Sequence, residues 1–412
     1  MINTGDTAWL LVSAALVMLM TPGLALFYGG LVGRKNLLST MMMSFTILAI
    51  IGLLWMLYGY SLGFSPDHMG IIGGLDYLGL QQVGQQPSSV YAPTVPHLAY
   101  MIFQAMFAII TVALITGAVV ERIRFSALLV FAVLWFTIVY LPVTHWVWGS
   151  GGWLARLGVL DFAGGIVVHI TAGVSALALA MLLGPRKSHA AREPMKPNNV
   201  PMVVLGAGLL WFGWFGFNAG SALTSGGLAS SAFVATYAAG AAAACTWMIL
   251  SWLYRRPSVL GMVTGAVVGL AAVTPAAGFI SPVMGIPIGI GAALVSYYAM
   301  LFRVKKMAAV DESLDVWACH GIGGTWGVIA TGIFASAAVN SAGSNGLIYG
   351  SATQIVKQLI GVAVVWVFAF GMTWVLGKVT DKIVGLRVNQ IEETVGLDIS
   401  QHGERAYGGI LR

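Results

Sequence analysis

The sequence has 412 residues, of which 58% are hydrophobic and only 8% are charged, whereas about 25% of the residues of an ordinary soluble domain are charged. A soluble domain of this composition would aggregate through its apolar surface, so the composition excludes that class and indicates a protein of the lipid bilayer. The net charge of +6 does not indicate a nucleic-acid partner, because the basic residues lie in clusters between apolar segments rather than on one face.

The first apolar segment follows a short N-terminal stretch whose only charge is Asp6. This stretch lacks the basic residues of a signal peptide, and the apolar run reaches Gly33, which is too long for a signal-peptide core. We therefore expect it to be retained as the first transmembrane helix.

Further apolar segments follow, each long enough to cross a hydrocarbon core of about 30 Å. The sequence thus predicts an all-α integral membrane protein with eleven transmembrane helices. Their expected ranges are 7–32, 37–63, 97–120, 125–145, 162–184, 200–220, 228–254, 258–277, 285–302, 312–338 and 351–384. The last range is longer than a membrane requires, so this helix should tilt or extend beyond the bilayer.

Lysine and arginine mark one side of the membrane. They cluster in the connections at 34–35, 122–124, 186–196, 255–256 and 303–306 and in the segment 378–412. The other loops are rich in Gly, Ser and Pro and lie at 65–96, 146–160, 221–226, 278–284 and 339–350. Only Arg156 and Lys357 fall near these loops. By the positive-inside rule, the N-terminus lies outside, the C-terminus lies in the cytoplasm, and the protein crosses the cell (inner or plasma) membrane many times.

The fifth and tenth segments share a spacing that indicates an internal repeat. His169 follows Asp161 by eight residues, and His320 follows Glu312 by eight residues. Two repeats of five helices would run in opposite directions, so the two histidine helices would be antiparallel. The expected division is a transmembrane domain of residues 1–384, with inverted repeats at about 7–184 and 200–338 and a final helix 351–384, followed by a cytoplasmic regulatory tail of residues 385–412.

This spacing also places the two imidazoles in depth. Eight helical residues rise about 12 Å, and each histidine is counted from the opposite membrane surface. In a core of about 30 Å both rings should therefore lie near the midplane. Glycines near both histidines would allow the helices to approach closely, so direct contact of the rings is a hypothesis.

Ionisable side chains inside a membrane span are costly and are functional candidates. In the predicted spans they are Asp161, His169, Glu312, Asp315, His320 and, near one end, His145. A lone membrane histidine is most simply a hydrogen-bonding link between helices, but a pair at matching depth indicates a transport role. Neutral imidazoles both donate and accept hydrogen bonds, so a pair could line a pore without fixed charge or relay a proton. The carboxylates are expected to cap helix starts, and Asp161 could also raise the affinity for a cation at the outer mouth.

Aromatic residues form the other signal. Phe103 and Phe107 share one helix face, and the sixth segment reads Trp211-Phe-Gly-Trp-Phe-Gly-Phe-Asn-Ala-Gly-Ser221. A single aromatic residue in a membrane usually faces lipid or fills the core. A cluster of rings can also bind a small cation, at about 0.5–2 kcal/mol for each cation–π contact, and a nearby hydroxyl can accept a hydrogen bond from that cation.

Metal, cofactor and disulfide chemistry are not expected. Cys245 and Cys319 lie in apolar runs, and the sequence contains no CxxC or HExxH pattern. The residue types and spacings of structural zinc sites and redox centres are therefore missing from the sequence.

The motifs that contain these residues resemble those of one known family. The run from Asp161 to Gly173, Asp-Phe-Ala-Gly-Gly-Ile-Val-Val-His-Ile-Thr-Ala-Gly, resembles the signature of the ammonium transporter/methylammonium permease/Rhesus family. The runs 103–107, 211–221 and Asp315-Val-Trp-Ala-Cys-His320-Gly resemble it as well. The tail from Gly396 to Tyr407 is similar to that of bacterial ammonium transporters, which favours this branch over the Rhesus branch.

The resemblance implies roles for individual residues. It implies that Phe107, Trp148 and Ser221 form an external ammonium-recruitment site. Phe103 would lie beside this site, and Asp161 would support it as a carboxylate. It also implies three parts of a pore: a gate made of the stacked rings Phe107 and Phe217, the twin imidazoles His169 and His320, and the pore-lining Trp214. The resemblance departs slightly at Glu312, where an aspartate is frequent in the family.

The resemblance also implies partners. It predicts a homotrimer with one pore in each subunit, ammonium or methylammonium as substrate, and a cytoplasmic PII-type signalling protein that docks on the inner face. The segment 186–199 and the tail are the places where such regulation should act. The sequence continues only a few residues beyond Tyr407, so no appended kinase or sensor domain is expected.

The hypothesis is that ammonium is captured outside, loses a proton, crosses a pore too apolar for a bare ion and is reprotonated inside, since ions are much costlier to bury than a neutral amine. Potassium has no proton to lose and would be rejected. Net movement of NH4+, or of NH3 plus H+, and neutral conduction of NH3 stay open. One alternative is an ammonium sensor of the same fold that transports little. Another, a membrane hydrolase built on Ser221 and His169, lacks a GxSxG or metal pattern, so no enzymatic activity is expected.

Overall fold

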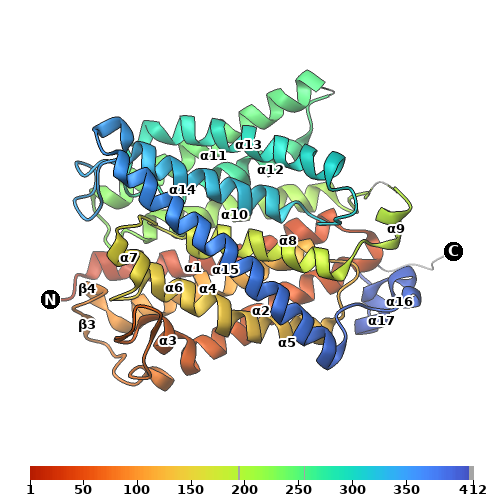
Figure 1. Cartoon of the computed structure of the whole chain (residues 1–412), viewed down its shortest axis with the longest axis horizontal. Helices are drawn as coiled ribbons and strands as arrows, with labels where there is room; N and C mark the ends of the chain where they lie inside the picture. The colour runs from red at the N-terminus through yellow and green to blue at the C-terminus, as the bar shows by residue number, and fades with distance from the viewer. Residues whose placement is uncertain (194, 255, 408–412) are drawn as a thin grey trace.

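A computed structural model of the chain describes residues 1–193, 195–254 and 256–407. Long helices lie side by side along the longest axis of the molecule (Figure 1). One end of the bundle carries α9, α16 and α17 and is called the tail end below; the opposite end carries β1–β4 and α7 and is called the loop end.

The first half of the chain, up to the segment that follows α8, contains the elements α1 (Thr4–Leu31), η1 (Arg34–Asn36), α2 (Leu37–Leu54), η2 (Trp55–Gly59), α3 (Tyr60–Phe64), β1 (Asp67–His68), β2 (Ile72–Gly73), η3 (Leu78–Leu80), β3 (Pro87–Ser88), β4 (Ala92–Pro96), α4 (His97–Ile115), η4 (Thr116–Ala118), α5 (Phe125–Trp135), η5 (Phe136–Tyr140), α6 (Leu141–Trp148), α7 (Trp153–Leu157), η6 (Gly165–Ile170), α8 (Thr171–Leu183) and α9 (Lys187–Ala190). The second half contains α10 (Val200–Gly220), α11 (Gly227–Tyr254), α12 (Val259–Val273), η7 (Pro282–Met284), α13 (Gly285–Lys306), η8 (Trp317–Ile322), α14 (Gly323–Phe334), η9 (Leu347–Tyr349), α15 (Ala352–Val384), α16 (Gln390–Val395) and α17 (Leu397–His402).

Nine helical stretches of the described residues are long and apolar enough to cross a membrane, which makes the chain a multi-pass membrane protein. They are Thr4–Leu31, Arg34–Phe64, His97–Ala118, Phe125–Leu157, Gly165–Leu183, Val200–Gly220, Gly227–Tyr254, Pro282–Lys306 and Ala352–Val384. The two other expected segments, 258–277 and 312–338, contain shorter helices, so the count of eleven stays a prediction.

The two shorter helices have local causes. Helix α12 ends at Val273; Thr274 still has helical backbone, but Pro275 has no backbone N–H with which to continue the helical hydrogen bonds. The tenth segment does not start at residue 312, because Asp315 has a left-handed φ of 57° that a right-handed helix cannot contain. Its helical part therefore begins only with η8.

The all-α expectation needs one correction at the loop end. The connection between α3 and α4 folds into two antiparallel hairpins, β1 with β2 and β3 with β4. Asp67 pairs with Gly73 and His68 with Ile72 in the first hairpin. These strands are too short to form a core of their own; β2 packs against α3 and α6, and β4 packs against α1 and α4.

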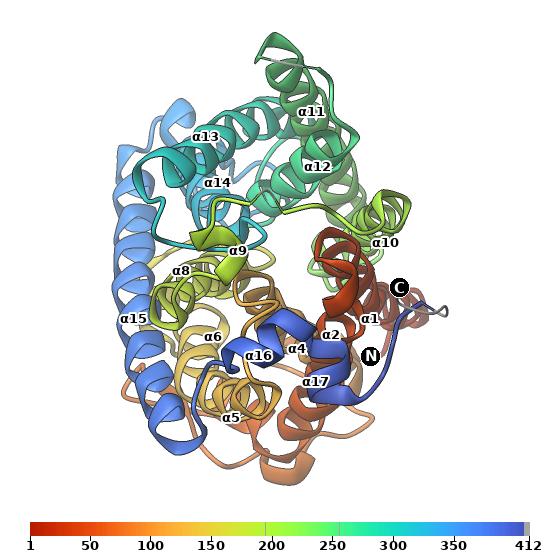
Figure 2. The ribbon, with the colours of Figure 1, turned by 90° about the vertical axis from the view of Figure 1, so that its right-hand side faces the viewer.

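The helices divide into two groups around the middle of the bundle. Viewed from the tail end, α1–α8 lie on one side, α10–α14 lie on the other, and α15 runs along the flank (Figure 2). Helix α1 lies against α10, and glycines allow this approach: a Cβ on Gly206 would lie 2.4 Å from the backbone nitrogen of Phe27. The first helices of the two expected repeats are therefore direct neighbours.

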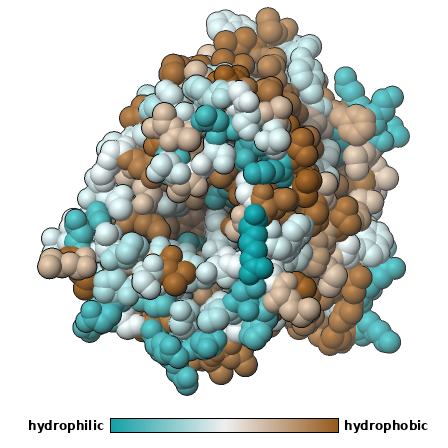
Figure 3. All heavy atoms as spheres, turned by 60° about the vertical axis from the view of Figure 1, so that its left-hand side comes forward, coloured by the Kyte–Doolittle hydropathy of each residue, from teal (hydrophilic) through white to brown (hydrophobic). Residues whose placement is uncertain are grey.

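The surface is that of a protein in contact with hydrocarbon. Large apolar side chains are exposed along the outer helices, for example Leu53, Phe212, Leu253 and Val367. Hydrophobic patches cover much of the face shown in Figure 3, and hydrophilic residues gather in smaller clusters on it. The polar contacts that matter for function lie inside the bundle and at its tail end.

Candidate functional site

The two histidines of the predicted pair lie on wide, π-helical turns. His169 belongs to η6 and His320 to η8, and such turns often occur at functional sites. The ring centroids are 5.1 Å apart with an interplanar angle of 26°, and the two Nδ1 atoms are 3.2 Å apart, within hydrogen-bond distance. Both rings are buried, so the structure brings these two imidazoles together in the middle of the bundle.

Glycines on both helices make this contact sterically accessible. Gly173 follows His169 by four residues, and a Cβ there would lie 2.1 Å from the backbone nitrogen of Gly321. Gly324 follows His320 by four residues, and a Cβ there would lie 3.0 Å from Cβ of His169. Each helix thus uses a glycine one turn beyond its histidine to receive the other helix.

Asp161 holds the start of the first histidine segment. Its carboxylate accepts hydrogen bonds from the backbone N–H groups of Gly164, Gly165, Ile166 and Val167 at 2.6–3.1 Å. The expected capping by Asp161 is confirmed by these contacts. Its side chain is buried, and all four N–H groups that point out of the turn are satisfied by it.

The second segment is capped by one carboxylate rather than two. Glu312 accepts hydrogen bonds from the backbone N–H groups of Val316 at 3.0 Å and Trp317 at 3.3 Å. The expectation that Asp315 also caps the helix is wrong, because its carboxylate instead accepts a hydrogen bond from Arg303 at 2.8 Å. The left-handed backbone of Asp315 turns this side chain away from the helix start.

Aromatic rings lead from the loop end to the histidines. Trp148, at the end of α6, lies edge-on to Phe107 of α4, with centroids 5.8 Å apart. Phe107 packs on Phe103 at 4.9 Å and on Phe217 of α10 at 4.3 Å. Phe217 stacks on His169 at 5.9 Å with an interplanar angle of 20°. The rings thus form a continuous series that ends at the imidazole pair.

Exposure separates the outer part of this series from its inner part. Trp148 and Ser221 are half-buried, whereas Phe103, Phe107 and Phe217 are fully buried. Trp148 donates its indole N–H to the backbone oxygen of Asp161 at 2.9 Å, and Ser221 donates its hydroxyl proton to the backbone oxygen of Phe217 at 2.8 Å. The Ser221 oxygen therefore retains lone pairs but no free proton, so it can only accept a further hydrogen bond.

Thr274 is a residue of the site that the sequence analysis missed. Its hydroxyl donates to the backbone oxygen of Leu270 at 2.8 Å and accepts the indole N–H of Trp214 at 3.0 Å. The same oxygen lies 3.3 Å from Nε2 of His169. The signal that could have indicated it is a lone hydroxyl next to Pro275 in an apolar segment, but many membrane threonines only bond to their own helix.

These contacts assign the protons on both rings. The single hydroxyl proton of Thr274 is directed to Leu270, so Nε2 of His169 must be the donor toward Thr274. In a neutral ring Nδ1 of His169 is then unprotonated and accepts a hydrogen bond from Nδ1–H of His320. The Nε2 of His320 is left as the nitrogen of the pair with a free lone pair.

The space around the pair is small and apolar. The cavity that contains both rings leaves about 20 Å³ of room for water-sized molecules, which is enough for about one water molecule. Apart from the histidines, its lining is almost entirely hydrocarbon and aromatic, and includes Met20, Leu24, Phe27, Tyr28, Ile110, Leu114, Val168, Leu210, Trp214, Phe217 and Val267. A second cavity of about 170 Å³ begins at His320 and includes Ser313 and Asp315, and it is called the inner vestibule below.

Among the described residues, no group of three or more His, Cys, Asp or Glu side chains could hold a metal ion. His145, the remaining histidine of the predicted spans, bonds to the backbone oxygen of Gly63 at 2.9 Å and to Asp67 at 3.0 Å. His145 therefore links the first hairpin to α6 through Asp67, and neither of its two hydrogen bonds involves the imidazole pair.

Comparison with known proteins adds a second line of evidence. A family model described as the Ammonium Transporter Family matches residues 8–407. The ammonium transporter of Bacillus subtilis is 51% identical over 404 residues, which cover 98% of each chain. Ammonium transporter Amt1 of Archaeoglobus fulgidus is 49% identical over 405 residues, which cover 98% of this chain and 100% of that relative.

Solved structures show the same similarity in three dimensions. The crystal structure of Saccharomyces cerevisiae Mep2 matches with a TM-score of 0.88 and 35% identity, covering 95% of this chain and 90% of Mep2. A protein described as a sensor Amt protein also matches with a TM-score of 0.88, at 28% identity, covering 97% of this chain and 98% of that chain.

The glycine contact between the histidine helices can be tested by adding one methyl group. Gly173→Ala places a Cβ against the backbone of Gly321, so we expect the helices to separate and the free energy of unfolding to fall by about 1–3 kcal/mol. Thermal unfolding of the purified protein measures this change. Gly371→Ala in α15, which meets no atom within 4 Å, is the matched control and should be neutral or slightly stabilising. Equal stability of the two variants would contradict the close contact.

The proton assignment can be tested at Thr274. Thr274→Val removes the acceptor at nearly constant volume, whereas Thr274→Ser retains it. We expect ¹⁵N spectra of histidine-labelled protein to show a mixture of imidazole tautomers in the valine variant and the wild-type pattern in the serine variant. Identical ring nitrogen shifts at His169 and His320 in the wild type and the valine variant would refute the role of Thr274.

Proposed function

This chain belongs to the ammonium transporter family, and from that premise we propose that it transports ammonium across the membrane through the apolar passage that contains His169 and His320. In this proposal NH4+ is recruited at the aromatic site of the loop end, loses a proton, and crosses as NH3, with net movement of NH4+ or of NH3 plus H+. The observation that carries the proposal is a pair of hydrogen-bonded imidazoles inside a cavity that is otherwise apolar.

The recruitment step uses Trp148, Phe107 and Ser221, with Phe103 behind them. Ring faces attract a cation by about 0.5–2 kcal/mol each, depending on desolvation. The Ser221 oxygen can accept an N–H of the ion, because its own proton is engaged with Phe217. Asp161 supports this site from within, since it fixes the turn whose backbone oxygen holds the Trp148 indole; its carboxylate is occupied by backbone N–H groups and does not reach the ion.

The gate of the proposal is the pair Phe107 and Phe217. Their rings are 4.3 Å apart and both are buried, so a substrate passes only when one of them rotates. The space beyond offers no ring of carbonyl or carboxylate oxygens that could replace the hydration shell of an ion. Burying an unpaired ion there is far costlier than burying NH3, which would exclude potassium.

The imidazole pair and Trp214 form the passage beyond the gate. Neutral rings present N–H groups and lone pairs to NH3 without any fixed charge. His320 lines both the passage and the inner vestibule, and the free lone pair at its Nε2 is the natural acceptor of a proton that moves along the pair. Asp315 also lines the vestibule, and its carboxylate is paired with Arg303 at 2.8 Å.

We further propose the membrane arrangement predicted from the sequence: eleven helices, an outside N-terminus, inverted repeats at about 7–184 and 200–338, a final helix 351–384 and a cytoplasmic regulatory tail 385–412 in the cell membrane. The reciprocal packing of Gly173 and Gly324 on the opposite histidine helix supports the inverted repeat. The concentration of basic residues at the tail end supports the orientation, since cytoplasmic loops carry the excess of Lys and Arg.

The proposed assembly is a homotrimer with one pore in each subunit. Apolar side chains such as Phe212, Tyr237 and Leu253 are exposed on α10 and α11, and they would face either lipid or a neighbouring subunit. The mass of the purified particle in detergent decides between a monomer and a trimer.

A PII-type signalling protein is the proposed cytoplasmic partner, docking on the tail end. We expect purified protein to retain such a partner in a pull-down whose outcome depends on nucleotide and 2-oxoglutarate. We expect the PII-type protein to stay bound when an irrelevant protein of similar charge is added. We expect it to be released under some of the nucleotide and 2-oxoglutarate conditions. Absence of binding under every condition would remove this partner from the proposal.

An ammonium sensor of the same fold is the second candidate function. The structural similarity to a sensor Amt protein supports it. The complete aromatic series and the apolar passage favour transport, because a sensor needs only the recruitment site. The two functions differ in whether charge or NH3 crosses the membrane.

Charge movement in proteoliposomes on addition of ammonium tests the proposed function. We expect a current with ammonium but not with potassium in the wild type, and a reduction by about 10²-fold or more in His169→Ala/His320→Ala, since a proton-transfer group of this kind contributes about that much. The variant must keep the thermal unfolding and particle mass of the wild type. No current in well-folded wild type would leave neutral conduction or a sensor, which an internal pH dye separates.

A further inference from the structure

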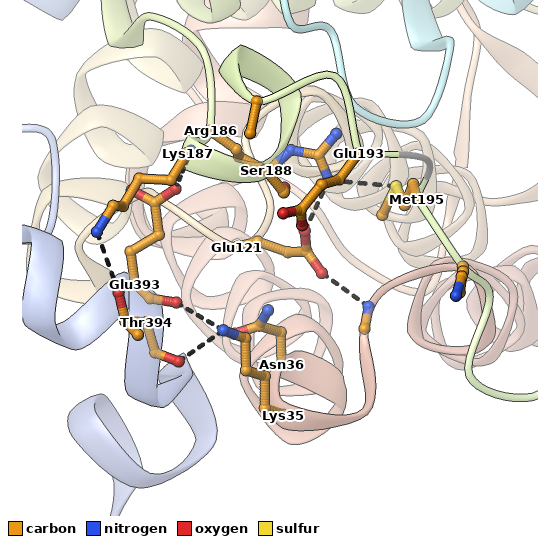
Figure 4. A pocket seen from close by; sticks show the side chains of 13 residues that line it. Lys35, Asn36, Glu121, Arg186, Lys187, Ser188, Glu193, Met195, Glu393 and Thr394 are labelled. Atoms are coloured by element: carbon orange, nitrogen blue, oxygen red, sulfur yellow. Dashed lines mark hydrogen bonds and ion pairs between the residues drawn. The ribbon is translucent and has the colours of Figure 1, made fainter.

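A cavity larger than the two that His320 lines lies outside the passage, at the tail end. It has a volume of about 740 Å³, within the range of about 300–1,000 Å³ that ligand pockets usually occupy. Four parts of the chain that are far apart in sequence form it: the connection between α1 and α2, Glu121 after η4, residues 186–193 with 195–196, and the helix α16 of the tail (Figure 4). We call it the tail-end pocket.

The floor of the tail-end pocket is rigid and neutral in charge. Arg186 is buried and bonds to Asp311 at 2.7 and 2.9 Å and to Glu121 at 2.6 Å. Glu393 is buried and accepts hydrogen bonds from the backbone N–H of Lys187 at 2.6 Å and from Arg387 at 2.8 Å. Each carboxylate of the floor therefore has an arginine partner, with the charge of one further buried arginine, Arg122, nearby.

Asp311 stays ionised at neutral pH. Burial raises the pKa of the Asp311 carboxyl, but the hydrogen bonds and charge of Arg186, with the charge of Arg122, outweigh burial and hold this pKa well below its usual range. The Asp311–Arg186 pair is thus charged at pH 7, and protonation of Asp311 does not free Arg186 for a ligand. The charge that a ligand meets comes from the rim.

The rim is basic. Lys35, Lys187 and Lys196 line it and are exposed, and Glu193 is the one exposed carboxylate in its lining. Across the described ranges none of these three lysines forms an ion pair with a carboxylate. Lys35 donates to the backbone oxygens of Glu393 and Thr394 at 3.0 and 2.7 Å, which leaves one N–H for another acceptor.

From these observations we propose that the tail-end pocket binds a small soluble polyanion that carries phosphate groups, held by Lys35, Lys187 and Lys196. Lysine ammonium groups bind phosphate as point charges, and three of them line a cavity of ligand size in which Glu193 is the one exposed carboxylate. Such a ligand contacts Lys35, which holds the tail through the backbone oxygens of Glu393 and Thr394, and it also contacts Lys187 and Lys196, so its binding stabilises the docked position of α16.

The position of the pocket gives this binding a consequence. Met195 lines both the tail-end pocket and the inner vestibule, and its sulfur accepts a hydrogen bond from Arg186 at 3.2 Å. A ligand on the segment 186–196 therefore acts on a side chain that also borders the exit of the passage. The binding inference does not depend on the proposed transport function, because it can be measured without transport.

Titration calorimetry of the purified full-length protein with inorganic pyrophosphate at fixed ionic strength tests the proposal. We expect saturable binding that weakens by about tenfold or more in Lys187→Gln/Lys196→Gln, since a hydrogen bond to a charged group is worth about 1.5–3 kcal/mol. Lys305→Gln/Lys306→Gln removes the same charge from the end of α13 and is the matched control, with wild-type binding expected. Equal loss of pyrophosphate affinity in both double variants would show nonspecific attraction and overturn the proposal. Absence of pyrophosphate binding to the wild type in both of the lipids named below would also overturn it.

Two further measurements place the ligand and its source. Hydrogen exchange of the amides in 390–395 should slow when pyrophosphate binds, and unchanged exchange there with measurable binding would overturn the placement. Nanodiscs of phosphatidylglycerol and of phosphatidylcholine separate two sources of phosphate. Equal pyrophosphate affinity in both supports a soluble ligand, whereas binding only in phosphatidylcholine shows that a lipid headgroup occupies the pocket and overturns the soluble source.

Discussion

The structure depends on the rule that a polar group in the middle of a membrane needs a partner from the protein, because hydrocarbon provides none. Two imidazoles carry four ring nitrogens, and three of them are engaged: the two Nδ1 atoms with each other and Nε2 of His169 with Thr274. Thr274 in turn is tied to its own helix and to Trp214. The one nitrogen without such a protein partner, Nε2 of His320, borders the cavities that lead to the tail end.

The backbone around the pair is arranged to keep this contact. Two capping carboxylates, Asp161 and Glu312, satisfy the N–H groups at the starts of the two histidine segments. Both segments begin as π-helical turns, and glycines at Gly173 and Gly324 let each helix reach the other. The caps, the wide turns and the glycines are separate features of the two segments, but together they determine one distance, the separation of the two rings.

The tail end differs from the middle of the bundle because it carries charged groups, some of which are exposed to water. Arg186 pairs with Asp311 and Glu121, and Glu393 pairs separately with Arg387, so two sets of ion pairs lie beneath an open cavity. Breaking such buried pairs by removing one partner costs about 3–5 kcal/mol, so the floor is rigid. The three lysines of the rim take no part in these ion pairs, and they give the tail-end pocket its positive charge.

The sequence by itself determined the membrane class, most of the helix ranges and the family, because hydropathy, segment length and motifs are local properties. It also placed both histidines at one depth, since that inference needs only the rise per residue. It did not predict the two hairpins in 65–96, the left-handed backbone and Arg303 partner of Asp315, the π-helical turns, or the hydroxyl of Thr274 beside a ring 105 residues away in sequence. Each of these is decided by which distant segments pack together, and only the tertiary structure settles where a buried donor finds its acceptor.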